Sequence, residues 1–179
     1  DNATVYERKI DAKKRWGSYN VNNNPVEIEG EKIFFKLSCY DRVGAYNRVS
    51  VYRIKVFENK KKIFEIAFDN VKRNELLYGA YVYDISKSTI AGEVSYVYNL
   101  CRKEGNNYSG IKTSGNGYIS LNSDTKNKKE ISISVSDFAG NEESLQFTVA
   151  GKKSSLNYDD YAKIDIKKNN SLTNKDNNI

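Results

Sequence analysis

The side chains that most often carry out chemistry are scarce in this sequence. It has no histidine and only two cysteines, Cys39 and Cys101, among 179 residues. Without imidazole, neither a Ser-His-Asp nor a Cys-His centre can form, and any zinc site that needs histidine is excluded. Two cysteines in separate segments are also too few for a four-cysteine zinc site. We therefore predict that the chain is not an enzyme and needs no cofactor.

The two cysteines leave two interpretations open. Cys39 belongs to the apolar side of an alternating segment and has no neighbouring base, which favours a buried structural thiol over a nucleophile. An even number of cysteines also suits a disulfide in an oxidising compartment, so Cys39 and Cys101 could pair. The sequence does not decide whether they do.

Carboxylates are the remaining candidates for chemistry, and the chain has 23 of them. Four aspartates near expected turns could offer oxygen ligands to calcium: Asp41, Asp69, Asp84 and Asp137. No EF-hand spacing accompanies them, so turn capping is the preferred interpretation. A glycosidase would need two acids about 5 to 9.5 Å apart in a cleft, and no pattern selects such a pair.

Tyrosine is frequent, with 14 residues, and it suggests binding rather than catalysis. Its rigid apolar ring and polar hydroxyl suit protein interfaces and stacking on sugars. We predict a binding patch made of these side chains: Tyr78, Tyr81, Tyr83, Arg48, Arg73 and Arg102. The alternative is that tyrosine replaces phenylalanine at half-buried positions of a sheet.

The net charge is +6, but the basic residues are interspersed with acids and form only short runs at 13–15 and 60–62. Solvated turns explain such runs, and no nucleic-acid-binding motif is present, so we predict no nucleic-acid partner. No apolar stretch approaches the about 18 residues of a membrane helix, so we predict no transmembrane segment. Because the sequence begins at Asp1 rather than Met, we expect that an upstream segment has been removed.

Alternating apolar and polar residues are the main structural signal, and they predict strands. Residues 50–68 indicate a hairpin with its turn at 58–61. Its alternation places Tyr52, Ile54 and Val56 on one face, and Phe64, Ile66 and Phe68 inward with Glu65 outward. Residues 131–149 indicate a second hairpin. In the second turn Asp137 can accept backbone N–H groups, and Gly140 or Asn141 can take a positive φ. Other elements are expected as strands at 33–40, 94–100 and 117–121, edge strands at 4–10 and 16–21, and a helical turn within 70–79.

These elements predict an all-β fold, an Ig-like antiparallel β-sandwich with a short helical turn and a flexible C-terminal tail. Residues 1–25 would supply N-terminal edge strands, and residues 26–150 would form the sandwich. Residues 151–179 are polar, mixed in charge and short of core-forming side chains, so we expect a disordered tail.

Several short segments occur in a distinctive order: Tyr40-Asp41-Arg42, Asn47-Arg48, Val51-Tyr52, Phe68-Asp69, the aromatic loop to Tyr83, and the closing segment 135–149. Together they resemble the C-terminal β-sandwich domain of lysostaphin-like (M23) bacterial envelope peptidases. The resemblance covers residues 26–150. The catalytic half of that family binds zinc through His-x₃-Asp and His-x-His motifs, which this chain cannot form because it has no histidine.

The resemblance implies a place in the bacterial cell envelope, periplasmic or surface-anchored, and a partner that is an envelope protein or peptidoglycan. It favours a non-catalytic binding or scaffolding domain, accessory to a peptidoglycan peptidase or to cell-wall machinery. One alternative is a surface-exposed adhesin that binds a host ligand. Another is a fragment of an M23 endopeptidase whose catalytic domain lies upstream.

Overall fold

The computed structural model describes residues 9–15, 18–22, 24–44, 47–90, 93–121 and 128–152. Strands dominate these residues, and the one α-helix among them has four residues, so the all-β prediction is confirmed. No described helix has the length and apolar character that crossing a membrane requires.

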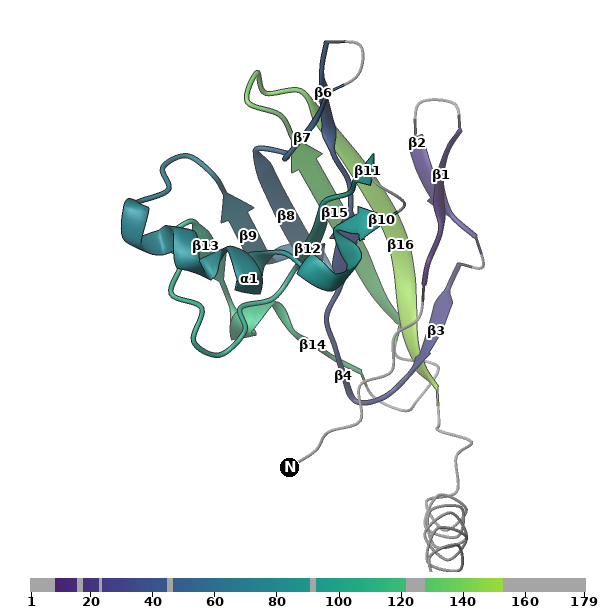
Figure 1. Ribbon diagram of the computed structural model, residues 1–179. Helices are drawn as coiled ribbons and strands as arrows, with labels where there is room; N and C mark the ends of the chain where they lie inside the picture. Colours follow the sequence, from purple (N-terminus) through teal and green to yellow (C-terminus); the bar gives the residue numbers. More distant parts are fainter. Residues whose placement is uncertain are drawn as a thin grey trace, which may run out of the picture.

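The main feature is an eight-stranded sheet with the order β1-β2-β16-β15-β8-β9-β13, to which β3 adds by pairing with β16 (Figure 1). Its strands are β1 (Ala12–Arg15), β2 (Ser18–Val21), β3 (Val26–Glu29), β8 (Arg53–Glu58), β9 (Lys61–Ala67), β13 (Ile111–Thr113), β15 (Lys128–Ser136) and β16 (Glu142–Lys152). The long β16 pairs antiparallel with β15 along one edge and parallel with β2 and β3 along the other. It therefore joins the N-terminal strands to the rest of the sheet.

Both predicted hairpins are confirmed as β8–β9 and β15–β16. The first turns at Asn59 and Lys60, which both have a positive φ (47° and 68°), as a two-residue type I′ hairpin requires. A bulge between Val56 and Phe57 adjusts the register just before that turn. The second turn contains Gly140, whose φ of 90° favours glycine.

Shorter elements form a second layer over one face of this sheet (Figure 1). Four strand pairs are present: β4 (Lys32–Ile33) with β14 (Ile119–Ser120), β5 (Lys36–Ser38) with β12 (Val97–Asn99), β6 (Asp41–Val43) with β7 (Asn47–Val49), and β10 (Thr89–Ile90) with β11 (Glu93–Val94). The helical pieces are η1 (Arg73–Tyr78), α1 (Gly79–Val82), η2 (Ile85–Lys87) and η3 (Gly115–Gly117). A helical turn was predicted within 70–79, and it is confirmed and continues into α1.

The core lies between the two layers. On the main sheet the predicted inward residues Ile54, Val56, Phe64 and Ile66 are almost fully buried. Burial alternates along β8, whereas in β9 all residues from Ile63 to Ala67 are buried. The second layer contributes side chains such as Phe35, whose ring meets that of Phe147 on β16 edge to face with centroids 5.4 Å apart. The opposite face of the main sheet carries mainly polar and charged side chains along β8 and β15, as expected for an antiparallel sheet with one covered face.

Three sequence expectations need correction. Glu65 lies on the polar face as predicted, but it is 7 % exposed rather than solvated, because Arg53 and Lys62 pair with it. The strand predicted at 33–40 is interrupted between β4 and β5. In the N-terminal region a strand forms at Ala12–Arg15 instead of at residues 9 and 10, and the rest of the strand predicted at 4–10 lies outside the described residues.

Two expectations remain predictions. The second layer consists of two-stranded pieces in the described part of the chain, so an Ig-like sandwich of two extended sheets is not established. Strand β16 continues through Gly151 to Lys152, and residues 153–179 of the predicted tail lie outside the described residues.

Candidate functional site

The predicted patch is divided among separate places in the fold. Tyr78 and Tyr81 lie on η1 and α1 with their rings edge to face and their centroids 6.4 Å apart, and Tyr81 is 37 % exposed. Arg73 is exposed at the start of η1. These three side chains share one helical segment, and the other three members of the patch do not lie on it.

Tyr83 belongs to an aromatic cluster inside the fold. Its ring lies 5.1 Å from that of Tyr98, and 6.1 and 6.2 Å from those of Tyr96 and Phe68. Its hydroxyl lies 3.1 Å from Ser50 Oγ, and burial raises its pKa. This position matches the alternative interpretation in which tyrosine replaces phenylalanine at half-buried sites.

Arg102 holds a loop in place through its guanidinium group. Its Nη1 donates to the carbonyl of Asn106 at 3.0 Å, and its Nη2 donates to the carbonyl of Ile111 at 2.5 Å. Both acceptors are backbone groups that would otherwise need water or another donor. Arg102 therefore closes the loop between β12 and β13.

Arg48 leads to a different group of residues, which we call the aromatic end: Tyr40, Arg42, Arg48, Tyr52, Arg53 and Phe138. The Arg48 guanidinium carbon lies 4.6 Å from the ring centroid of Tyr40, and that of Arg42 lies 5.8 Å from it. Arg42 Nη2 also donates to the Tyr40 hydroxyl at 3.3 Å. The β6–β7 pair thus places two arginines against one tyrosine.

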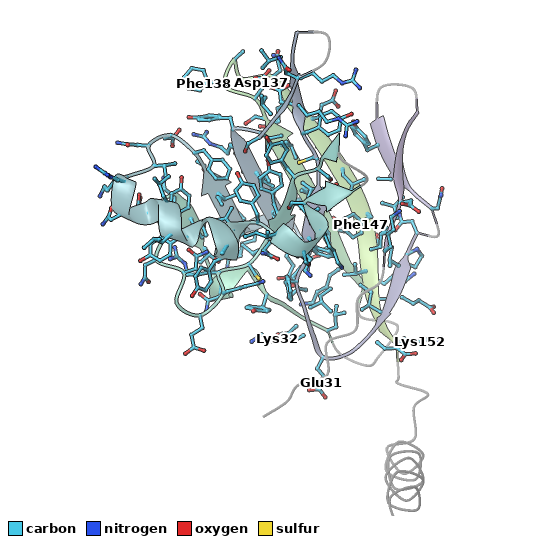
Figure 2. The ribbon with its side chains drawn as sticks, in the orientation of Figure 1. Glu31, Lys32, Asp137, Phe138, Phe147 and Lys152 are labelled. Carbon is cyan, nitrogen blue, oxygen red and sulfur yellow. The ribbon has the colours of Figure 1, made fainter. Side chains whose placement is uncertain are left out.

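Phe138 is the most exposed part of the aromatic end, at 85 %. Its ring meets that of Tyr52 edge to face at 5.2 Å, and the Arg53 guanidinium carbon lies 5.1 Å from the Tyr52 centroid. Tyr52 follows β7 by three residues, so chain connectivity keeps Phe138 close to the β6–β7 hairpin. Figure 2 shows Phe138 and Asp137 at the end of the sheet from which that hairpin projects.

The turn that carries Phe138 does not depend on its ring. Asp137 Oδ1 accepts the backbone N–H of Asn141 at 2.9 Å, and Oδ2 accepts Asn141 Nδ2 at 2.6 Å. The side-chain bond from Asn141 lowers the pKa of Asp137. Polar contacts and Gly140 therefore fix the turn, and the Phe138 ring is left facing solvent.

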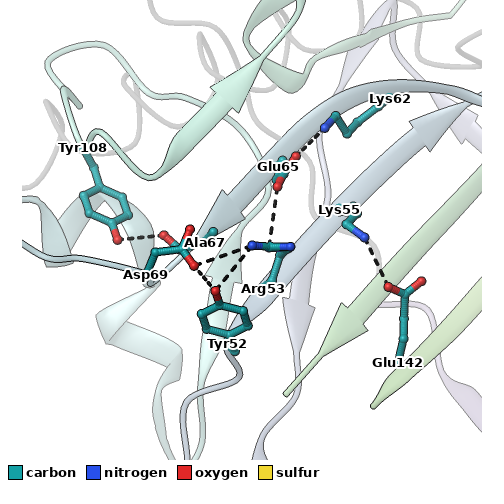
Figure 3. A network of polar contacts seen from close by, with 9 residues as sticks. All are labelled: Tyr52, Arg53, Lys55, Lys62, Glu65, Ala67, Asp69, Tyr108 and Glu142. Atoms are coloured by element: carbon teal, nitrogen blue, oxygen red, sulfur yellow. Dashed lines mark hydrogen bonds and ion pairs between the residues drawn. The ribbon is translucent and has the colours of Figure 1, made fainter. Parts of the chain in front are cut away.

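Arg53 connects the aromatic end to the polar face of the main sheet (Figure 3). Its Nη2 lies 3.6 Å from Asp69, whose carboxylate also accepts the Tyr52 hydroxyl, and its Nε lies 3.6 Å from Glu65. The pKa of Glu65 is lowered, chiefly by its hydrogen bond from Lys62. This network orients Tyr52 and Arg53 before any partner is bound.

The other residues considered for chemistry are engaged separately. Both cysteines are free thiols in the structure, so the disulfide considered from the sequence is not formed there. Burial raises the pKa of Cys39 to about 12 and also raises that of Cys101, which disfavours the reactive thiolate. Asp84 pairs with Lys36 at 2.8 Å, and no group of three or more Cys, Asp or Glu in the described ranges could hold a metal ion.

The patch prediction missed Tyr40, Tyr52 and Phe138. A signal for Phe138 was present in the sequence, because an apolar residue inside a turn set by Asp, Gly and Asn contributes nothing to that turn.

Fold and site together define an all-β domain that presents aromatic and arginine side chains on its hairpin ends. A scan of protein-family models and searches of curated proteins and of solved structures each gave no match to the chain.

Proposed function

We propose that this chain is a non-catalytic binding domain of a bacterial cell-envelope protein, accessory to a peptidoglycan peptidase or to cell-wall machinery. The proposal depends mainly on one observation, the 85 % exposure of Phe138 on a turn that does not need it. A large apolar ring held in water gains free energy when a partner covers it, by about 1.5–3 kcal/mol for full burial. Such a ring is therefore a candidate anchor for a partner.

The surroundings of Phe138 support a protein partner. Aromatic and arginine side chains are the types enriched at the energetic centres of protein interfaces. Arg53 and Tyr52 are already oriented by Asp69, so binding would order few additional side chains. Arg42 and Arg48 flank Tyr40 and would favour a partner with carboxylates or carbonyls facing them.

The envelope location comes from the resemblance to the M23-associated domain. Four of the segments that carry it, at 40–42, 47–48, 51–52 and 135–141, converge on the aromatic end. Because these segments lie together, they support one shared binding surface and not a set of turns without a common role. We include the Ig-like sandwich in this proposal, with the main sheet and the layer of short strands as its two halves.

A position-specific cross-linking experiment tests the proposal. A photoreactive benzoylphenylalanine replaces Phe138 in the full-length protein, expressed in its source bacterium. The matched control carries the same group at Lys61, which is exposed at the start of β9 and outside the aromatic end. Irradiation followed by fractionation should give an adduct at position 138, in the envelope fraction, that is absent with the group at position 61.

Two results would contradict the proposal. Equal cross-linking from positions 138 and 61 would mean that the aromatic end has no dedicated partner. Recovery of the protein and its adducts outside the envelope fraction would remove the envelope assignment, even if a specific adduct formed.

A further inference from the structure

A surface hollow of about 430 Å³ lies between β4 and the loop that Arg102 closes. Its lining includes Lys32, Arg102, Lys103, Asn106, Asn116 and Tyr118. Figure 2 places Lys32 and Phe138 toward opposite ends of the sheet, so the hollow is separate from the aromatic end. Its chemistry has no part in the function proposed above.

The hollow is positively charged. Three cations line it, Lys32, Arg102 and Lys103, against one carboxylate, Glu104. None of the three forms an ion pair with a carboxylate of the described residues. Since Arg102 donates to two backbone carbonyls, its position is fixed while its charge stays uncompensated. A concave surface with an excess of positive charge attracts anionic ligands.

Asn106 supplies a second and independent indication. It is 2 % exposed and lines the hollow, and its Oδ1 accepts the backbone N–H of Tyr108 at 3.1 Å. Its Nδ2 has no hydrogen-bond partner in the described part of the chain. A buried amide donor without an acceptor costs free energy, about 1–3 kcal/mol, that a ligand oxygen would recover. The Arg102 bond to the Asn106 backbone carbonyl and the Tyr108 N–H bond to its Oδ1 keep this residue in place.

Tyr118 forms an aromatic wall of the hollow. Its ring is half-buried and packs edge to face against Phe34 at 5.6 Å. Lys32 Nζ lies 4.4 Å from its centroid, so a cation and an aromatic ring are presented together. An aromatic wall beside amide donors suits the apolar face and the hydroxyl edge of a sugar ring.

From these features we infer that the hollow binds an acidic saccharide. The carboxylate of the sugar lies against Lys32 and Lys103, a hydroxyl or ring oxygen accepts from Asn106 Nδ2, and the sugar ring contacts Tyr118. The charge selects acidic sugars over neutral ones, and the ring contact and the amide select a sugar over a bare oxyanion.

The test is a titration of the full chain labelled with ¹⁵N, followed by the side-chain amide signals of Asn106 and the backbone signal of Gly105. The probes are glucuronate, glucose as the neutral sugar, and inorganic phosphate as the bare oxyanion. Glucuronate should shift these signals saturably and bind about tenfold or more tightly than either other probe, as expected for losing one good polar contact.

Three variants separate the contributions. Lys103→Gln removes one positive charge from the hollow. Asn106→Asp keeps the oxygen that accepts the Tyr108 N–H but replaces the unpaired Nδ2 donor with a carboxylate oxygen. Each substitution should weaken glucuronate binding about tenfold. Lys61→Gln makes the same charge change outside the hollow and should leave binding unchanged. If Asn106→Asp does not fold, the glucuronate affinity of Lys103→Gln still tests the inference. Absence of a saturable shift, equal binding of glucose or phosphate, or full binding by Lys103→Gln would overturn the inference.

Discussion

The hydroxyl of Tyr98 accepts the backbone N–H of Val51, with 3.0 Å between the two atoms. Tyr98 is fully buried on β12 of the second layer, and Val51 lies just before β8 of the main sheet. The same hydroxyl lies 3.0 Å from Ser50 Oγ, which also contacts the Tyr83 hydroxyl. A single tyrosine therefore ties the two layers together where the chain enters the sheet, close to the aromatic end.

Replacing Tyr98 by phenylalanine should destabilise the protein by about 1–3 kcal/mol, because the buried N–H of Val51 loses its acceptor while the ring still fills its place. Urea unfolding followed by circular dichroism measures the change. Tyr96→Phe is the control, since the Tyr96 hydroxyl makes no hydrogen bond with a described residue, and it should change stability by less than about 0.5 kcal/mol. Equal effects of the two substitutions would show that the Tyr98 hydroxyl does not join the layers.

Two glycines should respond in opposite ways to alanine. A Cβ at Gly110 would lie 2.2 Å from the Ala67 carbonyl oxygen, which the Tyr108 hydroxyl already holds at 2.8 Å. Gly110→Ala should therefore destabilise the protein by about 3 kcal/mol or more. Gly79 has helical φ and ψ of −52° and −39° and nothing within 4 Å of a Cβ, so Gly79→Ala should stabilise it by about 0.5–1 kcal/mol. A tolerated Gly110→Ala would mean that β9 and the loop before β13 are not packed this closely.

The sequence could predict the hairpins because their signals are local. Alternation marked Ile54, Val56, Phe64 and Ile66 as inward, and Asn59 suited a turn that needs positive φ. The parallel pairing of β16 with β2 and β3 could not be predicted, since it joins segments more than about a hundred residues apart and no local pattern specifies a partner strand.

The candidate site was less accessible to sequence reasoning, because residue type does not say which way a side chain points. Arg102 was expected in an exposed patch, yet its donors serve the carbonyls of Asn106 and Ile111. Tyr83 was expected at the surface and lies against Tyr98. Phe138 could have been singled out, since the turn around it is set by polar residues alone.

Glu65 should make the protein sensitive to acid. Its pKa is lowered in the folded state, chiefly by the Lys62 hydrogen bond, so its stabilising contribution is present above the unfolded value near pH 4.5 and is lost as pH falls through the folded value. Glu65→Gln keeps the shape but not the charge, and it should cost about 1 kcal/mol at pH 7. Between pH 5 and pH 3 the variant should lose less stability than the wild type.

The control is Glu31→Gln, because Glu31 is exposed, and its loss of stability in acid should match that of the wild type. Parallel curves of stability against pH for Glu65→Gln and the wild type would contradict the stabilising role of the Glu65 ion pair.

At alkaline pH the Cys39 thiol should have the opposite influence. Burial beside Tyr83 and Tyr98 raises its pKa from 9.0 to about 12, so the folded state keeps a proton that the unfolded chain releases. Its stabilising contribution is complete below pH 9 and declines as pH rises toward 12.

The Cys39→Ala variant has no thiol proton to release. Between pH 8 and pH 10 it should therefore lose about 1 kcal/mol less stability than the wild type, measured by urea unfolding at each pH. Ser38→Ala, at the neighbouring exposed position, keeps the thiol and should lose as much as the wild type. Identical losses in Cys39→Ala and the wild type would mean that the thiol is hydrated, and that the cluster around Tyr98 does not exclude water from it.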